Sequence, residues 1–271
     1  MPELPDIYIL ARSMDQAITG RKIVGVTVNQ PRVLNTKPKT FANRVVGRSV
    51  EHVFQRGKWV VCELDESWTI LLNLGMGGEV RLHEPGEVPD GKKQKVVFRL
   101  DDGKQVWVHF WWFGHVHLAS KGKHSLHPQV SKLGPEPLAE EFTEETLAQM
   151  LKRKRGRIKV HLLDQSFIAG IGNVYIQDIL WYARIHPERA ASDLRPEEVG
   201  RLHGAIQKVF RDGIESGGGP GEQDIWGNAG RYTEHLQVGY KTGKPCPACG
   251  TIVEELRVGS TTSYICKHCQ H

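Results

Sequence analysis

The spacing of apolar residues predicts one leading helix followed by a long series of strands. Apolar side chains recur at helical spacing from Pro5 to Ile18, and Gly20 supplies a stop signal. From Lys22 to about Leu118 the pattern changes to short β-branched and aromatic runs separated by turn residues. Many short strands at this spacing indicate a β-sandwich or barrel. Examples of the predicted strands are 23–28, 50–54, 59–64, 68–74, 79–83, 95–100 and 105–110.

Helical spacing returns after a polar, proline-containing connector at residues 119–142. A glycine-rich run at 217–221 ends the last helix, and we expect 217–242 to form a mobile loop and a strand. The predicted helices begin at Thr143, cover 159–164 and 173–183, and extend from Pro196 to about Ser216. The fold class is therefore α+β, divided into a first domain at 1–127, a linker at 128–142, a helical domain at 143–240 and a cysteine segment at 241–271.

Composition identifies a globular chain and leaves nucleic-acid binding open. Of the 271 residues, 25% are charged and 39% hydrophobic, which excludes a disordered protein. No apolar run is long enough to span a membrane, and the N-terminus has no apolar signal region, so we expect a cytoplasmic location and no membrane partner. The formal net charge of +5 is compatible with nucleic-acid binding but does not require it.

Four of the five cysteines form two C-x2-C pairs near the C-terminus. Cys246 and Cys249 precede Cys266 and Cys269, with sixteen residues between the pairs. Two such pairs can hold one Zn²⁺ tetrahedrally, and four protein ligands leave no open position, so the predicted zinc is structural. The alternative is four reduced cysteines without metal. The intervening segment alternates like a β-hairpin; His268 and His271 are expected to be exposed, and Cys62 to be an ordinary buried thiol.

A basic run and a glycine turn lie together at the start of the helical domain. Glycines at 170 and 172 let backbone amides approach a ligand closely, and a helix N-terminus favours anions. Asn173 follows and is also a good N-cap residue, which is its simpler interpretation. The basic run is equally compatible with a solvated helix end, but the combination indicates a grip on a phosphate backbone. Its members are Lys152, Arg153, Lys154, Arg155, Arg157 and Lys159.

The N-terminus offers one further candidate for chemistry. Removal of Met1 would make Pro2 the first residue, and its secondary amine would be partly unprotonated at neutral pH. Such an amine can attack a carbonyl-like carbon and form a Schiff base, with Glu3 beside it as general acid or base. By itself Met-Pro is a common chain start, so these residues need support from the rest of the sequence.

Several short motifs occur in a fixed order along the chain. They are Pro2-Glu3-Leu4-Pro5, Arg56-Gly57-Lys58, Leu74-Gly75-Met76, Phe113-Gly114, residues 133–138, Gly170-Ile171-Gly172-Asn173-Val174-Tyr175, Ile185-His186-Pro187, Leu236-Gln237-Val238 and the four cysteines. In this order they resemble the Fpg/Nei family of DNA glycosylases. This resemblance implies an N-terminal β-sandwich, a helix–two-turn–helix domain and a zinc-finger β-hairpin, with damaged double-stranded DNA bound between the two halves of a monomer.

The family chemistry assigns roles to individual residues. By this resemblance the Pro2 amine attacks C1′ of a damaged nucleotide, the base leaves, and elimination from the Schiff base cleaves the strand. Glu3 would move protons at the sugar, and Lys58 would contact DNA near the reaction centre. Asn173 would grip the phosphate backbone, with Gly172 and Lys159 beside it. The simpler interpretation of Lys58 is a surface turn lysine.

Base flipping requires an apolar wedge that fills the gap left in the stack. By the same resemblance Met76 is the main wedge and Phe113 a second one. The alternative for both residues is core packing at the end of a strand.

The sequence departs from the family pattern at two DNA-contacting positions. An arginine usually stands five residues before the third cysteine, where this chain has Thr261, which keeps a hydroxyl but no charge. Arginines usually precede Phe-Gly, and one pairs with the opposite base, where this chain has Trp112. A tryptophan can stack on a base but cannot make the arginine's hydrogen bonds. We therefore expect a glycosylase and AP lyase with weak excision of 8-oxoguanine. The alternative is a binder of abasic or distorted DNA that excises nothing.

Overall fold

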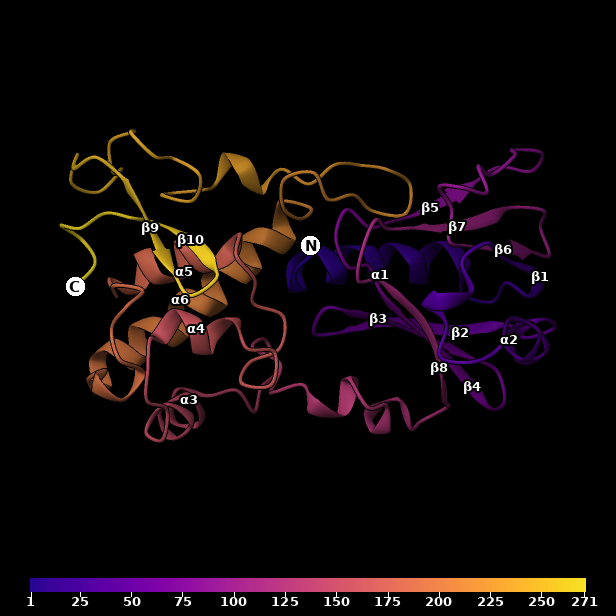
Figure 1. The fold of residues 1–271 in the computed structure, drawn as a ribbon, viewed down its shortest axis with the longest axis horizontal. Coiled ribbons are helices and arrows are strands. Elements are labelled where there is room, and N and C mark those ends of the chain that lie inside the picture. Colours follow the sequence, from indigo (N-terminus) through magenta and orange to yellow (C-terminus); the bar gives the residue numbers. More distant parts are fainter. The chain divides into compact units, whose positions relative to one another are not determined.

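The computed structural model describes residues 1–271 and divides the chain into two compact units (Figure 1). Unit 1 comprises Met1–Lys132 and Gly217–Gly230, and unit 2 comprises Leu133–Ser216 and Arg231–His271. The loop at 217–230 thus belongs to unit 1, whereas the sequence pattern groups it with the helices of 143–240. None of the helices combines the length and apolar character that a membrane crossing requires.

Unit 1 is a β-sandwich of two four-stranded antiparallel sheets, and helix α1 (Leu4–Ile18) packs along strands β2 (Val50–Arg56) and β3 (Trp59–Leu64). Apolar side chains from both sheets and from α1 form one continuous core. One sheet has the order β1 (Ile23–Val28), β6 (Val96–Leu100), β7 (Gln105–His109) and β5 (Glu79–His83). The other has the order β2 (Val50–Arg56), β3 (Trp59–Leu64), β4 (Trp68–Asn73) and β8 (His115–Ser120).

The sequence pattern misses two elements of unit 1. Helix α2 (Pro38–Val45) is short and buries only Phe41 and Val45, one turn apart, so its helical period is barely visible. Strand β8 alternates buried Val116 and Leu118 with histidines, and the polar histidines obscure the strand. Three short 3-10 helices complete the unit: η1 (Pro31–Val33), η2 (His124–Leu126) and η3 (Val130–Lys132).

Unit 2 contains four α-helices and the C-terminal hairpin. Helix α3 (Glu144–Leu151) begins where the Thr143 hydroxyl accepts a hydrogen bond from the amide of Thr146. The other elements are α4 (Ile158–Leu163), α5 (Tyr175–Ala183), α6 (Pro196–Glu215), the 3-10 helices η4 (Ala191–Asp193) and η5 (Tyr232–Glu234), and the hairpin strands β9 (Glu254–Val258) and β10 (Thr261–Ile265).

Two local predictions are wrong. The third helix starts at Tyr175 with Val174 in the N-cap position, so Asn173 lies before the cap and its side chain is used elsewhere. No strand forms between 217 and 242; that stretch contains a single isolated bridge between Gln223 and Ala229, and the helix η5. Its apolar residues instead fill positions in the two cores, as Ile225 does in unit 1 and Val238 in unit 2.

Candidate functional site

The N-terminal end of α1 carries two buried carboxylates. Glu3 occupies the N-cap position and forms a capping box with Asp6, whose Oδ2 accepts a hydrogen bond from the Glu3 amide over 2.7 Å. Only 2% of Glu3 and 6% of Asp6 is exposed. Pro2 is buried beside them and Met1 is exposed. While Met1 is attached, the Pro2 nitrogen is an amide, so amine chemistry at Pro2 requires removal of Met1.

Lys58 faces the same two carboxylates from the turn between β2 and β3. Gly57 supplies the left-handed backbone of this two-residue turn, with a φ of +57°, and Arg56 pairs with Trp59 on either side. Burial lowers the pKa of the Lys58 ammonium, and the negative charges of Glu3 and Asp6 partly offset that decrease. The structure therefore brings Glu3 and Lys58 together at the buried Pro2.

The loop at 217–230 is anchored to the same region. The Gly219 amide donates to Oδ1 of Asp6 over 2.7 Å, and the Ile225 amide donates to the Ser13 hydroxyl over 3.1 Å. Ile225 is fully buried, so this loop contributes to the core of unit 1. These contacts place Glu222 near the head of α1.

Sequence reasoning missed Glu222, since a lone glutamate in a glycine-rich segment carries no recognisable motif. Burial raises the pKa of the Glu222 carboxyl to about 8, and the negative charge of Asp6 adds to that increase. The N-terminal amine acts in the opposite direction, and Glu3 adds a smaller increase. A carboxyl with this pKa keeps its proton at neutral pH.

Two neighbouring loops of unit 1 present exposed apolar side chains. The Met76 amide donates to the Trp112 carbonyl over 2.9 Å, and the Trp111 amide donates to the Met76 carbonyl over 3.0 Å. Exposed fractions are 45% for Met76, 62% for Trp112 and 72% for Phe113. The alternative that Met76 and Phe113 pack in the core is therefore wrong.

The geometry of these loops depends on a glycine and on Asn73. A Cβ at Gly75 would lie 2.0 Å from the Trp112 carbonyl oxygen, and the φ of Gly75 is +53°, so only glycine fits there. The Asn73 side chain donates to the Lys58 carbonyl over 3.0 Å and accepts from the Gly75 amide over 3.2 Å. Asn73 thereby fixes the Met76 loop relative to the Lys58 turn.

In unit 2 the glycine turn is held by two glutamines. Gln165 accepts from the Gly170 amide over 2.9 Å and donates to the Ile171 carbonyl over 2.8 Å. Gln177 on α5 donates to Oδ1 of Asn173 over 3.1 Å. Since Oδ1 of Asn173 is an acceptor in that bond, its Nδ2 group is the atom that can donate to a phosphate oxygen. Gly172, also predicted at the phosphate grip, is buried in this turn.

Lys159 lies in a different environment from the rest of the basic run. Its side chain is fully buried, and Nζ donates to the Thr262 carbonyl over 2.5 Å and to the Ser263 hydroxyl over 2.8 Å. Burial lowers the pKa of this ammonium to about 8. The Lys159 ammonium therefore binds the hairpin and is not exposed to solvent. Thr261, at the tip of the hairpin, is half-exposed.

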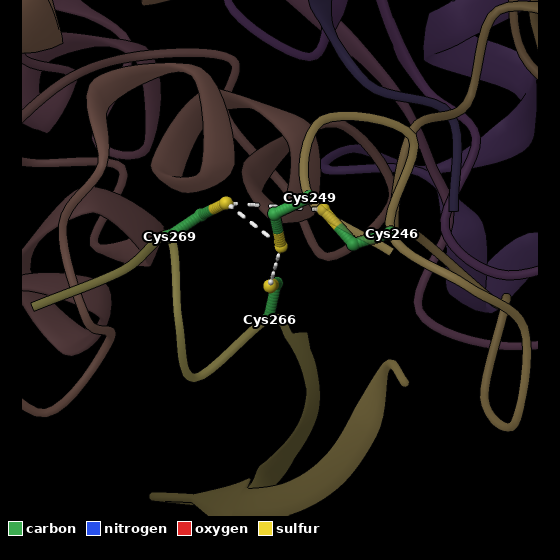
Figure 2. Close-up of side chains that lie close together, drawn as sticks. All are labelled: Cys246, Cys249, Cys266 and Cys269. Carbon is green, nitrogen blue, oxygen red and sulfur yellow. Dashed lines mark hydrogen bonds between the residues drawn. The ribbon is translucent and has the colours of Figure 1, made fainter. Parts of the chain in front are cut away.

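The four cysteines of the finger converge on one point (Figure 2). In each pair the amide four residues after the first cysteine donates to that cysteine's carbonyl: Gly250 to Cys246 over 2.9 Å, and Gln270 to Cys266 over 3.0 Å. Tetrahedral Zn–S bonds of about 2.3 Å require sulfurs about 3.8 Å apart. The Sγ–Sγ distances are 3.9 Å for Cys246–Cys269, 3.4 Å for Cys249–Cys266 and 3.5 Å for Cys249–Cys269. The cluster fits one structural zinc ion, as predicted.

Comparisons with protein families agree with this architecture. Residues 1–111 match the formamidopyrimidine-DNA glycosylase N-terminal domain, 133–223 match the formamidopyrimidine-DNA glycosylase H2TH domain, and 243–271 match the zinc finger found in FPG and IleRS.

Curated relatives match over the whole chain. A formamidopyrimidine-DNA glycosylase of Chloroflexus aurantiacus is 37% identical over 274 residues, covering 100% of this chain and 98% of its own. One from Pelotomaculum thermopropionicum is 38% identical, with coverage of 100% and 99%. The chain therefore belongs to the formamidopyrimidine-DNA glycosylase family, as its motifs predicted.

Solved structures show the same fold. The Lactococcus lactis Fpg in complex with an abasic site containing DNA has a TM-score of 0.92 and 28% identity, with 99% of each chain covered. A structure of MutM in complex with carbocyclic 8-oxo-G containing DNA has a TM-score of 0.91 and 29% identity, again with 99% of each chain covered. The predicted β-sandwich, helix–two-turn–helix domain and zinc-finger hairpin are confirmed.

Proposed function

We propose that this chain is a bifunctional DNA glycosylase and AP lyase that uses the Pro2 amine as nucleophile. The observation that carries the proposal is the grouping of Glu3, Asp6 and Lys58 around a buried Pro2 at the head of α1. Titratable groups with perturbed pKa values cluster at functional sites, and an amine nucleophile needs nearby groups that accept and donate protons.

The reaction begins when the unprotonated Pro2 amine attacks C1′ of the damaged nucleotide. The C1′–base bond breaks, the base takes a proton, and the Pro2 nitrogen loses its own proton as the sugar ring opens to a Schiff base. Glu3 is placed to take the proton from the Pro2 nitrogen, to pass it to the ring oxygen as the ring opens, and later to accept the proton removed during elimination of the 3′ phosphate. The Lys58 ammonium adds a positive charge beside these carboxylates.

Damaged double-stranded DNA is the proposed partner. The similar structures described above contain abasic or damaged DNA, and both units of this chain carry groups suited to the same task. Met76 and Phe113 are exposed on loops that are fixed by hydrogen bonds, as a wedge requires. Asn173 presents an amide donor beside the glycine turn, suited to a phosphate oxygen.

The lesion preference is proposed to differ from that of an 8-oxoguanine enzyme. Trp112 presents an exposed ring with a single N–H donor, which can stack on any base but cannot make two hydrogen bonds to the edge of a cytosine. Thr261 offers a hydroxyl without charge at the finger tip. We therefore propose an oxidised pyrimidine or a formamidopyrimidine as the preferred lesion.

Borohydride trapping on abasic-site DNA tests the proposed function. The protein with Met1 removed, verified by mass, should form a covalent adduct, and Pro2→Gly should lose most of it. Lys92→Met, which removes an exposed charge outside the predicted DNA-binding residues, serves as the control and should keep the adduct. Tight binding of abasic DNA without any adduct would favour the non-excising binder instead.

A further inference from the structure

Glu222 is the third carboxyl at the head of α1, and the reaction as described leaves it without a role. The loop reaches this position because the Gly219 amide bonds to Asp6, and the Glu222 amide then closes a turn onto the Gly219 carbonyl over 3.2 Å. Downstream, the Gly230 amide donates to the Glu222 carbonyl over 2.9 Å. The backbone of Glu222 is therefore fixed on both sides.

A second set of contacts holds the far side of the loop against β5. Arg81 donates from Nη1 to Oε1 of Gln223 over 2.7 Å and from Nη2 to the Trp226 carbonyl over 3.3 Å. The Leu82 amide donates to the Ile225 carbonyl over 2.9 Å. Arg81 thus binds Gln223 and Trp226, while the charges that act on the Glu222 carboxyl come from the head of α1.

The charged groups that face Glu222 come from three elements. Asp6 and Glu3 lie at the start of α1, the terminal amine precedes them, and Lys58 faces the two carboxylates from the β2–β3 turn. Three carboxyls thus share the space near two amines, and like charges at this range cannot all be ionised at low cost. One carboxyl should keep its proton at neutral pH.

Hydrogen bonding decides which carboxyl remains protonated. Both oxygens of Asp6 accept backbone N–H bonds, from Glu3 and from Gly219, which stabilises its anionic form. Glu3 belongs to the capping box at a helix N-terminus, where negative charge is favourable. Glu222 belongs to the loop and not to the first turn of α1, so its carboxyl lacks the backbone bonds and the capping box that stabilise the other two anions, and the proton is best placed on it.

We propose that Glu222 is a catalytic general acid of this site, which gives its proton to the departing base. This inference rests on the proposed glycosylase function. As the C1′–base bond breaks, the carboxyl proton moves to the base and Glu222 becomes a carboxylate. The proton removed from C2′ during elimination then passes from Glu3 to Glu222, so that protons balance over the cycle and no reactant other than water is needed.

The test compares base excision with trapping on DNA that already lacks the base. Glu222→Gln keeps the size of the side chain but has no proton to give, so single-turnover excision of a substrate lesion should fall about 100-fold at neutral pH. Trapping on abasic-site DNA, where no base departs, should change less than about threefold. The decline of the wild-type excision rate above a pH of about 8 should disappear in this variant.

Gln223→Ala is the matched control, since it removes the contact to Arg81 but no titratable group; it should retain the wild-type pH profile. If Glu222→Gln does not fold, Glu222→Asp is used instead. Because aspartate is a shorter acid, this variant should excise more slowly than the wild type, and its excision rate should still fall at alkaline pH. An unchanged excision rate and pH profile in Glu222→Gln would overturn the inference. A wild-type protein that neither excises nor traps would instead overturn the proposed function.

Discussion

Lys159 donates to the carbonyl of Thr262 over 2.5 Å, so a buried ammonium supports the tip of the zinc-finger hairpin. Gln177 donates to the same carbonyl over 3.2 Å, and its Oε1 accepts from the Tyr264 amide over 3.0 Å. Gln177 also contacts Asn173, as described above. The hairpin and the glycine turn, which are distant in sequence, are therefore joined through the Gln177 side chain, and Lys159 adds a second link from α4 to the hairpin.

Replacement of Lys159 by methionine should loosen the finger. The change removes both hydrogen bonds and leaves the Ser263 hydroxyl buried without that partner, at a cost of about 1–3 kcal/mol. Zinc release to a chelator should become faster and DNA affinity weaker. Lys152→Met removes the same charge from an exposed position and should leave zinc release unchanged. Wild-type zinc retention in Lys159→Met would contradict the supporting role.

The sequence predicts the fold where a local pattern repeats. The α1 period, most of the strands and the two cysteine pairs are each specified by neighbouring residues, and all of them appear in the structure. The sequence pattern does not reveal strand β8, because polar histidines occupy positions that are packed in the structure. His115 stacks on Trp59 and also contacts His117.

The candidate site is less accessible to sequence reasoning because its contacts are long-range. Asp6 and Gly219 are 213 residues apart, so no local signal links Glu222 to the head of α1. In the sequence, Lys159 cannot be distinguished from the other members of the basic run. Its burial depends on the zinc-finger hairpin, which lies more than a hundred residues later in the chain. The motif resemblance indicates which residues are important for function. Only the packing distinguishes a residue that can contact a DNA phosphate from one that stabilises the hairpin.

Removal of zinc should affect unit 2 far more than unit 1. Cys246, Cys266 and Cys269 pack with Val238 and Val253 in a small cluster that contains no residue of the sandwich core. Without metal this cluster loses its main crosslink, so the finger should open while the sandwich stays folded. Hydrogen exchange after chelation should show lost protection at residues 241–271 and unchanged protection in β2, β3 and β4. Simultaneous loss of protection in both units would contradict this expectation.

Trp112 should determine how the enzyme treats the base opposite the lesion. Its ring is 62% exposed and its nearest aromatic neighbour is Trp111, at 6.3 Å between ring centroids. Stacking tolerates every base, so wild-type excision should vary less than about threefold with the opposite base. Trp112→Arg should introduce a preference for cytosine of about tenfold, since a bidentate contact gives about 1–3 kcal/mol of discrimination.

Single-turnover rates with the lesion opposite each of the four bases measure this effect. Trp111→Arg is the control, because Trp111 is held over Gly77 and against His109 and should not reach the same base. Efficient 8-oxoguanine release by the wild type with strong cytosine dependence would contradict both this prediction and the proposed lesion preference.

Acidification should destabilise unit 1 through its histidine cluster. Nδ1 of His117 lies 3.0 Å from Nε2 of His127, and burial lowers the pKa of His117 to about 4, with the nearby His115 and His127 adding to that decrease. Unfolded histidines have a pKa of about 6.5, so between pH 6.5 and 4 the unfolded state binds the proton first. Because the ring is partly solvated, the loss in the free energy of unfolding should be on the order of 1–2 kcal/mol.

Urea unfolding at pH 7 and pH 5 should show this decline in the wild type and a smaller one in His117→Gln. The exposed His235→Gln should behave as wild type, and an equal decline in all three proteins would assign the acid sensitivity to other groups.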